Sequence, residues 1–245
     1  MSEEKRREEK KEGPSVDLES CGRRLRSLYD AWSDAKTAAF FNGAECVLLG
    51  SGANKEEELR YLKAVSLEIW LFSYELPDTV MAFVKKDGDD ANEMHAIASG
   101  KKAKLLESAR ETIESSIKGK LTVHVKPKNE DGSAQVEALV KILQEKCAKV
   151  GACAKELKEG NLMQMAVEKL GGAEKLADVT SGIACVLSRK DEKEMKFVDN
   201  AVKLCSESMK FAVSEVENAI EEELKISHVK LSEKTEDAIL APAKT

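Results

Sequence analysis

Three histidines and six cysteines are the side chains of this sequence best suited to metal binding or nucleophilic chemistry. His95, His124 and His228 fall on three separate predicted elements, and no cysteine stands near them at ligand spacing. Metal and catalytic sites need groups that converge, and metal ligands usually recur at short, regular spacings. We therefore predict structural histidines and no catalytic, cofactor-binding or metal-binding residue.

The cysteines are scattered along the chain and form no Cys-x-x-Cys pair. This pattern is typical of reduced core thiols in an intracellular protein rather than of a disulfide framework or a metal site. We predict reduced thiols at all of these positions, which are Cys21, Cys46, Cys147, Cys153, Cys185 and Cys205.

A glycine-containing loop, Gly50-Ser51-Gly52, follows a predicted strand at Glu45–Leu49 and precedes a predicted helix. That order is the context in which phosphate-binding loops occur. However, Lys55 stands where the dinucleotide-binding pattern has its third glycine, and no Gly-Lys-Ser/Thr follows. We favour a flexible loop before a helix over a phosphate site.

Acidic residues outnumber basic ones, and the net charge is −6. This balance argues against a non-specific nucleic-acid binder, which needs a basic face, and mildly favours basic partners. Charge runs such as Asp87–Asp90 are most simply solvated faces, although they can also meet Lys/Arg-rich partners. The candidate contact face for a basic partner is Glu215, Glu217, Glu221, Glu222 and Glu223.

The stretch Glu56–Val84 is the one around which the other elements must be organised. Pro77 ends a helix in its first half, and the β-prone run Thr79–Val84 in its second half is typical of a buried strand. We place the core at this joint and expect Trp70 to be largely buried. Helical spacing in the first half relates Leu59, Leu62, Val65, Ile69 and Phe72.

Helices and strands alternate through the rest of this region, which indicates an α/β domain with a largely parallel or mixed sheet. The polar turn Lys85–Asn92 is expected to join Thr79–Val84 to a hairpin partner at Met94–Ala98. The other expected helices are 18–32, 101–117, 134–149 and 162–170. The other expected strands are 121–125, 150–154, 177–180 and 183–187.

Three segments are expected in this chain of 245 residues. Residues 1–15 form a disordered charged tail, residues 16–188 form the α/β lobe, and residues 189–245 carry helices without strands. A long apolar stripe follows Asp191, and a second helix begins at Ser227 and ends at Leu240 before Pro242. The exposed apolar faces of these helices suggest the opening of a larger domain. No apolar run reaches membrane length and the N-terminus lacks an apolar signal core, so we expect an intracellular protein.

Several phrases of the sequence resemble the large subunit of the FACT histone chaperone family. The longest is RYLKAVSLEIWLFSYELPDTVMAF at residues 60–83, and RLRSLYDAW at residues 24–32 precedes it. VHVKPKNEDG at residues 123–132 and the segment Ser227–Lys244 are similar to the plant-type members. The phrases occur in the family's order from about Leu18 to Thr245.

This resemblance implies a mixed-sheet N-terminal lobe of the creatinase and aminopeptidase P-like fold, followed by the incomplete start of a second, "pita-bread" lobe. It also implies a non-catalytic, nuclear and chromosomal protein that takes part in nucleosome reorganisation during transcription, replication and repair. The implied partners are histones, the central tetramer more than the flanking dimer, and the HMG-box subunit of FACT or other chromatin factors. Neither sequence-specific nucleic-acid binding nor membrane binding is expected. The alternative is a vestigial metallopeptidase-type lobe that binds a peptide or small molecule.

Overall fold

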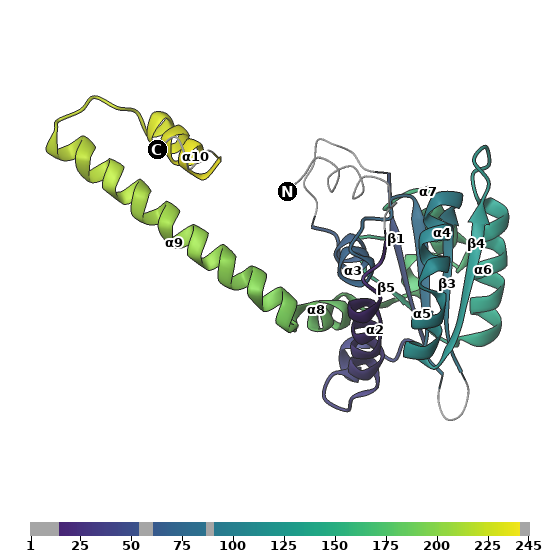
Figure 1. Cartoon of the computed structure of the whole chain (residues 1–245). Helices are drawn as coiled ribbons and strands as arrows, with labels where there is room; N and C mark the ends of the chain where they lie inside the picture. The colour runs from purple at the N-terminus through teal and green to yellow at the C-terminus, as the bar shows by residue number, and fades with distance from the viewer. Residues whose placement is uncertain (1–14, 54–60, 87–90, 241–245) are drawn as a thin grey trace, which may run out of the picture. The chain divides into compact units, whose positions relative to one another are not determined.

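The computed structural model describes residues 15–53, 61–86 and 91–240 (Figure 1). Residues 1–14 of the predicted tail 1–15, the predicted helix start at Glu56–Arg60 and the charge run at 87–90 lie outside the described residues. Contacts within the chain divide it into two compact units, one up to Ser188 and one from Arg189 onward. We refer to the first unit as the lobe and to the second as the helical segment.

A six-stranded mixed sheet forms the centre of the lobe, in the strand order β4-β3-β2-β1-β5-β6. The pairs β1–β2 and β2–β3 are antiparallel, and the remaining pairs are parallel. The predicted hairpin is therefore confirmed, and β2 lies in the sheet interior as expected. The strands are β1 (Cys46–Ser51), β2 (Thr79–Val84), β3 (Asn92–Ser99), β4 (Gly119–Lys126), β5 (Val150–Ala152) and β6 (Ala177–Asp178).

Helices cover both faces of this sheet (Figure 1). Side chains on a strand alternate between its two faces, so Val47 and Leu49 of β1 join one core while Cys46 and Leu48 join the other. The first core is closed by α2 (Leu18–Ser33), α3 (Lys63–Phe72), α4 (Gly100–Ser108), α5 (Arg110–Ile117) and α8 (Thr180–Ser188). The second is closed by α6 (Ser133–Lys146) and α7 (Asn161–Lys169). Short 3₁₀ turns lie at η1 (Ala38–Phe41) and η2 (Ala173–Lys175).

Helix α3 begins at Lys63, because a carboxylate from elsewhere in the chain caps it there. Glu156 accepts hydrogen bonds from the backbone N–H groups of Lys63 (2.6 Å) and Ala64 (3.0 Å). A carboxylate at this end satisfies two orphan donors and favours the helix dipole. The buried face of α3 also differs from the predicted stripe: Trp70 is buried as expected, whereas Ile69 is 44% exposed. Its buried residues are Ala64, Leu67, Glu68, Trp70, Leu71 and Phe72.

Two other predicted elements were wrong. Residues 183–187 form part of helix α8 rather than a strand, since a short apolar run suits a buried helix as well as a buried strand. Asp178 starts this helix by accepting the Thr180 N–H at 2.9 Å. The single helix expected at 101–117 is divided at Ala109, whose N–H returns to Leu106 in a 3₁₀-type bond.

The outer strand β4 is protected by two side chains of α5. Arg110 Nη1 donates to the Leu121 carbonyl at 2.7 Å, and Glu114 Oε1 accepts the Leu121 N–H at 3.0 Å. Arg110 also pairs with Glu114 at 2.7 Å, so the two side chains hold each other in place. Both backbone groups of Leu121 are therefore occupied at the edge of the sheet.

The helical segment consists of α9 (Glu192–Glu221) and α10 (His228–Leu240), as the sequence predicts. Asp191 begins α9 with a capping box that includes Glu194. Helix α10 contacts α9, where Lys234 Nζ lies 2.6 Å from Glu215 Oε2. No residue of either helix is buried in the described part of the chain. A search of the described helices finds none that is both long and apolar enough to cross a membrane.

Candidate functional site

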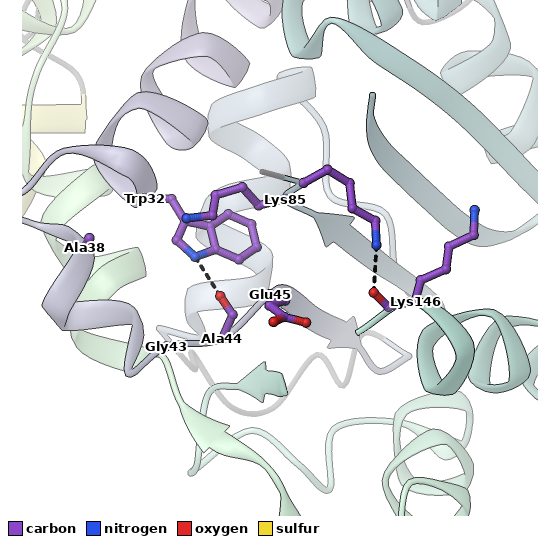
Figure 2. A pocket seen from close by; sticks show the side chains of 8 residues that line it. Trp32, Ala38, Gly43, Ala44, Glu45, Lys85 and Lys146 are labelled. Atoms are coloured by element: carbon purple, nitrogen blue, oxygen red, sulfur yellow. Dashed lines mark hydrogen bonds between the residues drawn. The ribbon is translucent and has the colours of Figure 1, made fainter. Parts of the chain in front are cut away.

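A pocket of about 440 Å³ lies where the N-terminal end of β1 meets the C-terminal ends of β2, α2 and α6 (Figure 2). Antiparallel pairing of β1 and β2 brings these segments together, because it sets Cys46 opposite Val84. The pocket is lined by Trp32, Ala38, Gly43, Ala44, Glu45, Lys85, Lys86 and Lys146. Its lining therefore combines one aromatic ring, three lysines and one carboxylate.

The indole of Trp32 forms a rigid wall of this pocket. Its Nε1 donates a hydrogen bond to the Ala44 carbonyl at 3.0 Å (Figure 2). The ring stacks on Phe41 with centroids 5.4 Å apart and contacts Tyr29 at 5.9 Å. Aromatic contacts of this kind stabilise a ring beyond its area burial. With its polar atom already bonded and the residue only 1% exposed, Trp32 fixes the shape of the pocket but presents almost no open ring surface to a ligand.

The three lysines that line the pocket have different bonding partners. Lys85 Nζ lies 5.9 Å from the Trp32 ring centroid, within the range of a cation–π contact. Lys86 Nζ donates to the backbone carbonyl of Lys146 at 2.6 Å, at the end of α6. Lys146 Nζ pairs with Glu93, and Glu45 accepts the Ala148 N–H at 2.6 Å. Lysine charges thus outnumber the single carboxylate in the lining.

Two of the three histidines are brought together next to this network, although they lie on separate strands. His95 of β3 and His124 of β4 stack with centroids 5.8 Å apart. His95 Nε2 lies 2.9 Å from Glu93 Oε2, so a neutral ring donates through this nitrogen. His95 Nδ1 and His124 Nε2 are buried without a hydrogen-bond partner. Burial lowers the pKa of both rings, and their proximity lowers that of His124 further.

These contacts suit a structural pair of neutral imidazoles. Burial alone would raise the pKa of Glu93, but hydrogen bonds from Lys146 and His95 outweigh it and lower the pKa. Within residues 15–53, 61–86 and 91–240, no group of three or more His, Cys, Asp or Glu side chains could hold a metal ion. His228 begins α10, far along the chain from the other two histidines.

Glu68 is a buried carboxyl group that the sequence patterns did not single out. It is 1% exposed on α3 and accepts the Leu76 N–H at 2.9 Å. Ser51 Oγ lies 2.7 Å from both Glu68 Oε1 and the Leu76 carbonyl, and its one hydrogen can serve only one of them. A protonated Glu68 resolves this, because it donates to Ser51 while Ser51 donates to Leu76. Burial raises the pKa of Glu68 to about 7. The feature of the sequence that could have indicated this buried carboxyl group is that Glu68 is the only charged residue in the apolar run Leu67–Phe72.

The cysteines follow the prediction only in part. All six are free, and four of them are buried, but Cys205 on α9 is exposed. Burial raises the pKa of the Cys46 thiol, and the neighbouring Cys147 thiol raises it further. Burial also raises the pKa values of Cys21 and Cys153 to about 12, so both thiols are protonated at neutral pH.

The glycine loop is more regular than expected. Gly50 and Ser51 belong to β1, and Gly52 lies close to the backbone of Gly160, where a Cβ would approach Gly160 N to 3.2 Å. Lys55 lies outside the described residues. The described glycines are therefore used for strand packing and close backbone approach.

The five glutamates of the predicted acidic face do not form one continuous surface on α9. Glu217 and Glu221 stand four residues apart and share one side of α9, whereas Glu215 is paired with Lys234. Helix α9 ends at Glu221, with Glu222 at its C-cap and Glu223 at a positive φ of 50°. All of these glutamates except Glu215 are exposed.

Comparison with known proteins gives a consistent family. The model of the "FACT complex subunit SPT16 N-terminal lobe domain" matches residues 16–182. The FACT complex subunits SPT16 of Arabidopsis thaliana and Oryza sativa are 34% and 32% identical over 94% of this chain. The chain spans only 22% of the length of these curated relatives.

Solved structures agree with this match. The N-terminal domain of FACT complex subunit SPT16 from chickpea has a TM-score of 0.79 at 34% identity, covering 94% of this chain and 52% of that one. The corresponding domain from Eremothecium gossypii, at 24% identity with a TM-score of 0.73, shares the fold. The mixed α/β fold predicted from the sequence is confirmed. The chain belongs to the FACT complex subunit SPT16 N-terminal lobe domain family.

Proposed function

We propose that this chain is a non-catalytic part of a chromatin factor of the FACT large-subunit type. The single observation that carries the proposal is the family match over residues 16–182, which the chickpea domain supports at a TM-score of 0.79. The proposed location is the nucleus, on chromosomes, and the proposed role is nucleosome reorganisation in transcription, replication and repair. The HMG-box subunit of FACT and other chromatin factors are proposed as protein partners.

The proposed direct ligand is a histone surface, with the central tetramer preferred over the flanking dimer. Residues 189–245, which we propose as the start of a second lobe, supply the exposed glutamates Glu217, Glu221, Glu222 and Glu223. Glu215 belongs to the same proposed contact region, although Lys234 already neutralises part of its charge. Exposed charges attract a basic partner over about 8 Å at physiological salt. The interaction is therefore expected to be weak and salt-dependent.

A titration of charge variants tests this proposal. The variant Glu221→Gln/Glu222→Gln/Glu223→Gln is titrated with the histone tetramer and the histone dimer at two salt concentrations. We expect it to bind the tetramer several-fold more weakly than the parent at low salt, with a flatter salt dependence, because surface pairs contribute little individually. A matched control, Glu145→Gln/Glu168→Gln/Glu174→Gln, removes three exposed charges from the lobe. Equal affinities of parent and both variants would overturn the proposed contact region.

A peptide-binding or small-molecule-binding lobe of metallopeptidase descent is the second candidate. The pocket of about 440 Å³ favours it, since ligand sites of proteins are typically concave and of this order of volume. Incubation of the chain with a mixed peptide library and added Mn²⁺ or Zn²⁺ separates binding from catalysis. We expect no hydrolysis, and cleavage that is abolished by a chelator would contradict a non-catalytic assignment.

A further inference from the structure

We propose that the Trp32 pocket binds a short acidic segment of a partner protein, with the carboxylates of the segment at Lys85 and Lys86. This proposal concerns the lobe alone and is independent of the histone contacts proposed for α9. It assigns a ligand class to a pocket that the acidic composition of the chain did not predict. The fixed shape of the pocket, the bonding state of each lysine and the charges around them support it.

The wall is fixed before any ligand arrives. Trp32 is 1% exposed, stacked on Phe41, and hydrogen-bonded to the Ala44 carbonyl. Gly43 has no side chain and Ala38 carries only a methyl group, so little side-chain bulk fills this part of the lining. A site that needs little ordering on binding loses less affinity to conformational entropy. The lining therefore needs little rearrangement when a ligand carboxylate reaches the lysines.

Lys85 is the cation best placed for a new partner. Its ammonium group contacts the Trp32 ring, and within the described residues no carboxylate pairs with it (Figure 2). Lys86 is held by a carbonyl oxygen, which leaves its charge uncompensated and two further N–H donors available. The carboxylate of Glu45 is anchored by the Ala148 N–H, and that of Glu93 is shared by Lys146 and His95. The three lysines consequently give the pocket lining a net positive charge.

The surroundings favour a carboxylate ligand over a nucleic-acid backbone. The chain carries a net charge of −6, which repels an extended phosphodiester outside the pocket. An extended nucleic-acid backbone needs a basic face that continues well beyond one pocket. The nearby helix ends, those of α2 and α6, are C-terminal and add no positive charge around the lysines. A short acidic peptide needs only the local charge of the pocket.

Fluorescence anisotropy with a labelled peptide of alternating glutamate and alanine tests the proposal at low salt. The variant Lys85→Gln/Lys86→Gln is compared with Lys104→Gln/Lys141→Gln, which removes two exposed lysines outside the pocket. We expect about tenfold weaker binding for the first variant and less than about twofold for the second, given the size of single surface pairs. Lys85→Gln alone, which removes no hydrogen bond, should weaken binding about threefold, so a loss caused by misfolding is distinguishable.

A substitution that is expected to strengthen peptide binding provides a second test. Glu45→Gln keeps the acceptor for the Ala148 N–H but removes the only carboxylate of the lining. We expect it to strengthen binding of the acidic peptide about twofold to threefold. A peptide with glutamine in place of glutamate should not bind measurably. The proposal would be overturned if the two double-lysine variants lost equal affinity for the peptide, or if the parent did not bind the peptide. It would also be overturned if a thymine oligonucleotide bound more tightly than the peptide and depended on Lys85.

Discussion

The lobe and the helical segment have sequences of similar helical periodicity but opposite burial. Helix α2 buries Leu25, Leu28 and Trp32, which are at most 1% exposed. Helix α9 repeats apolar residues just as regularly, yet Val202 is 61% exposed and Ile220 is 71% exposed. Periodicity therefore predicts that a helix forms and which side is apolar, whereas burial depends on what packs against that side. The same kind of substitution should have very different effects in the two units.

The largest difference is expected for apolar truncations. Trp70→Ala should lower the unfolding free energy of the lobe by about 3–5 kcal/mol, because it removes a large side chain from the core and leaves a cavity. Val202→Ala on α9 should change it by less than about 0.5 kcal/mol. Chemical denaturation of both variants measures the contrast. A Trp70→Ala protein with the stability of the parent would remove Trp70 from the core.

A pH-dependent difference is expected next, from the buried Glu68. The folded lobe keeps the Glu68 proton up to about pH 7, whereas the unfolded chain releases it near pH 4.5. Its stabilising contribution is complete below pH 4.5 and is lost as the pH rises through about 7. The shift from 4.5 to about 7 corresponds to roughly 3 kcal/mol. The neutral variant Glu68→Gln, whose amide can serve both Ser51 and Leu76, should gain stability relative to the parent across this interval.

Denaturation of parent and Glu68→Gln between pH 4.5 and 8 checks this expectation. His95 and His124 act in the opposite direction in both proteins, because their lowered pKa values make stability fall as the pH drops below about 6.5. The difference between the two proteins cancels this common contribution. A difference that does not vary with pH would show that Glu68 is already ionised in the folded lobe.

The smallest of these differences concerns helix caps. Glu156→Ala should lower the unfolding free energy of the lobe by about 1–2 kcal/mol, because α3 loses the acceptor for two backbone donors within the core. Asp191→Ala removes a cap of α9 and should accelerate hydrogen exchange only in the first turn of that helix. Hydrogen exchange resolved by residue distinguishes global from local loss. Similar global destabilisation by both variants would contradict the contrast between the two units.

Local patterns were sufficient for much of the fold. Thr79–Val84 and its hairpin partner, helix 18–32 and the two C-terminal helices follow directly from residue spacing and turn residues. The start of α3 did not, because its cap, Glu156, comes from a segment more than ninety residues away. The apolar run at 183–187 was ambiguous between strand and helix, and only its packing beneath the 3₁₀ turn, where Gly182 contacts Phe41, resolves it.

The candidate site was less accessible to sequence reasoning, and for a definite reason. The lining of the Trp32 pocket comes from five segments, and the proximity of the more distant ones depends on the strand order. No spacing in the sequence therefore links Trp32 with Lys85 or Lys146. His95 and His124 likewise meet only because β3 and β4 pair in a register that sets Ile97 opposite His124. The family, in contrast, was recognisable from continuous phrases such as residues 60–83.

The ion pair that holds Leu121 bears on how this protein behaves at high concentration. An exposed outer strand with free N–H and C=O groups is a template on which other chains can polymerise. At β4, an incoming strand would have to displace Arg110 and Glu114 from Leu121 and leave both charges to be resolvated. The opposite edge, β6, is only two residues long and offers little length for pairing. The occupied groups of Leu121 and the shortness of β6 thus make strand addition less favourable at each end of the sheet, which would favour a lobe that remains dispersed in the crowded nucleus proposed for it.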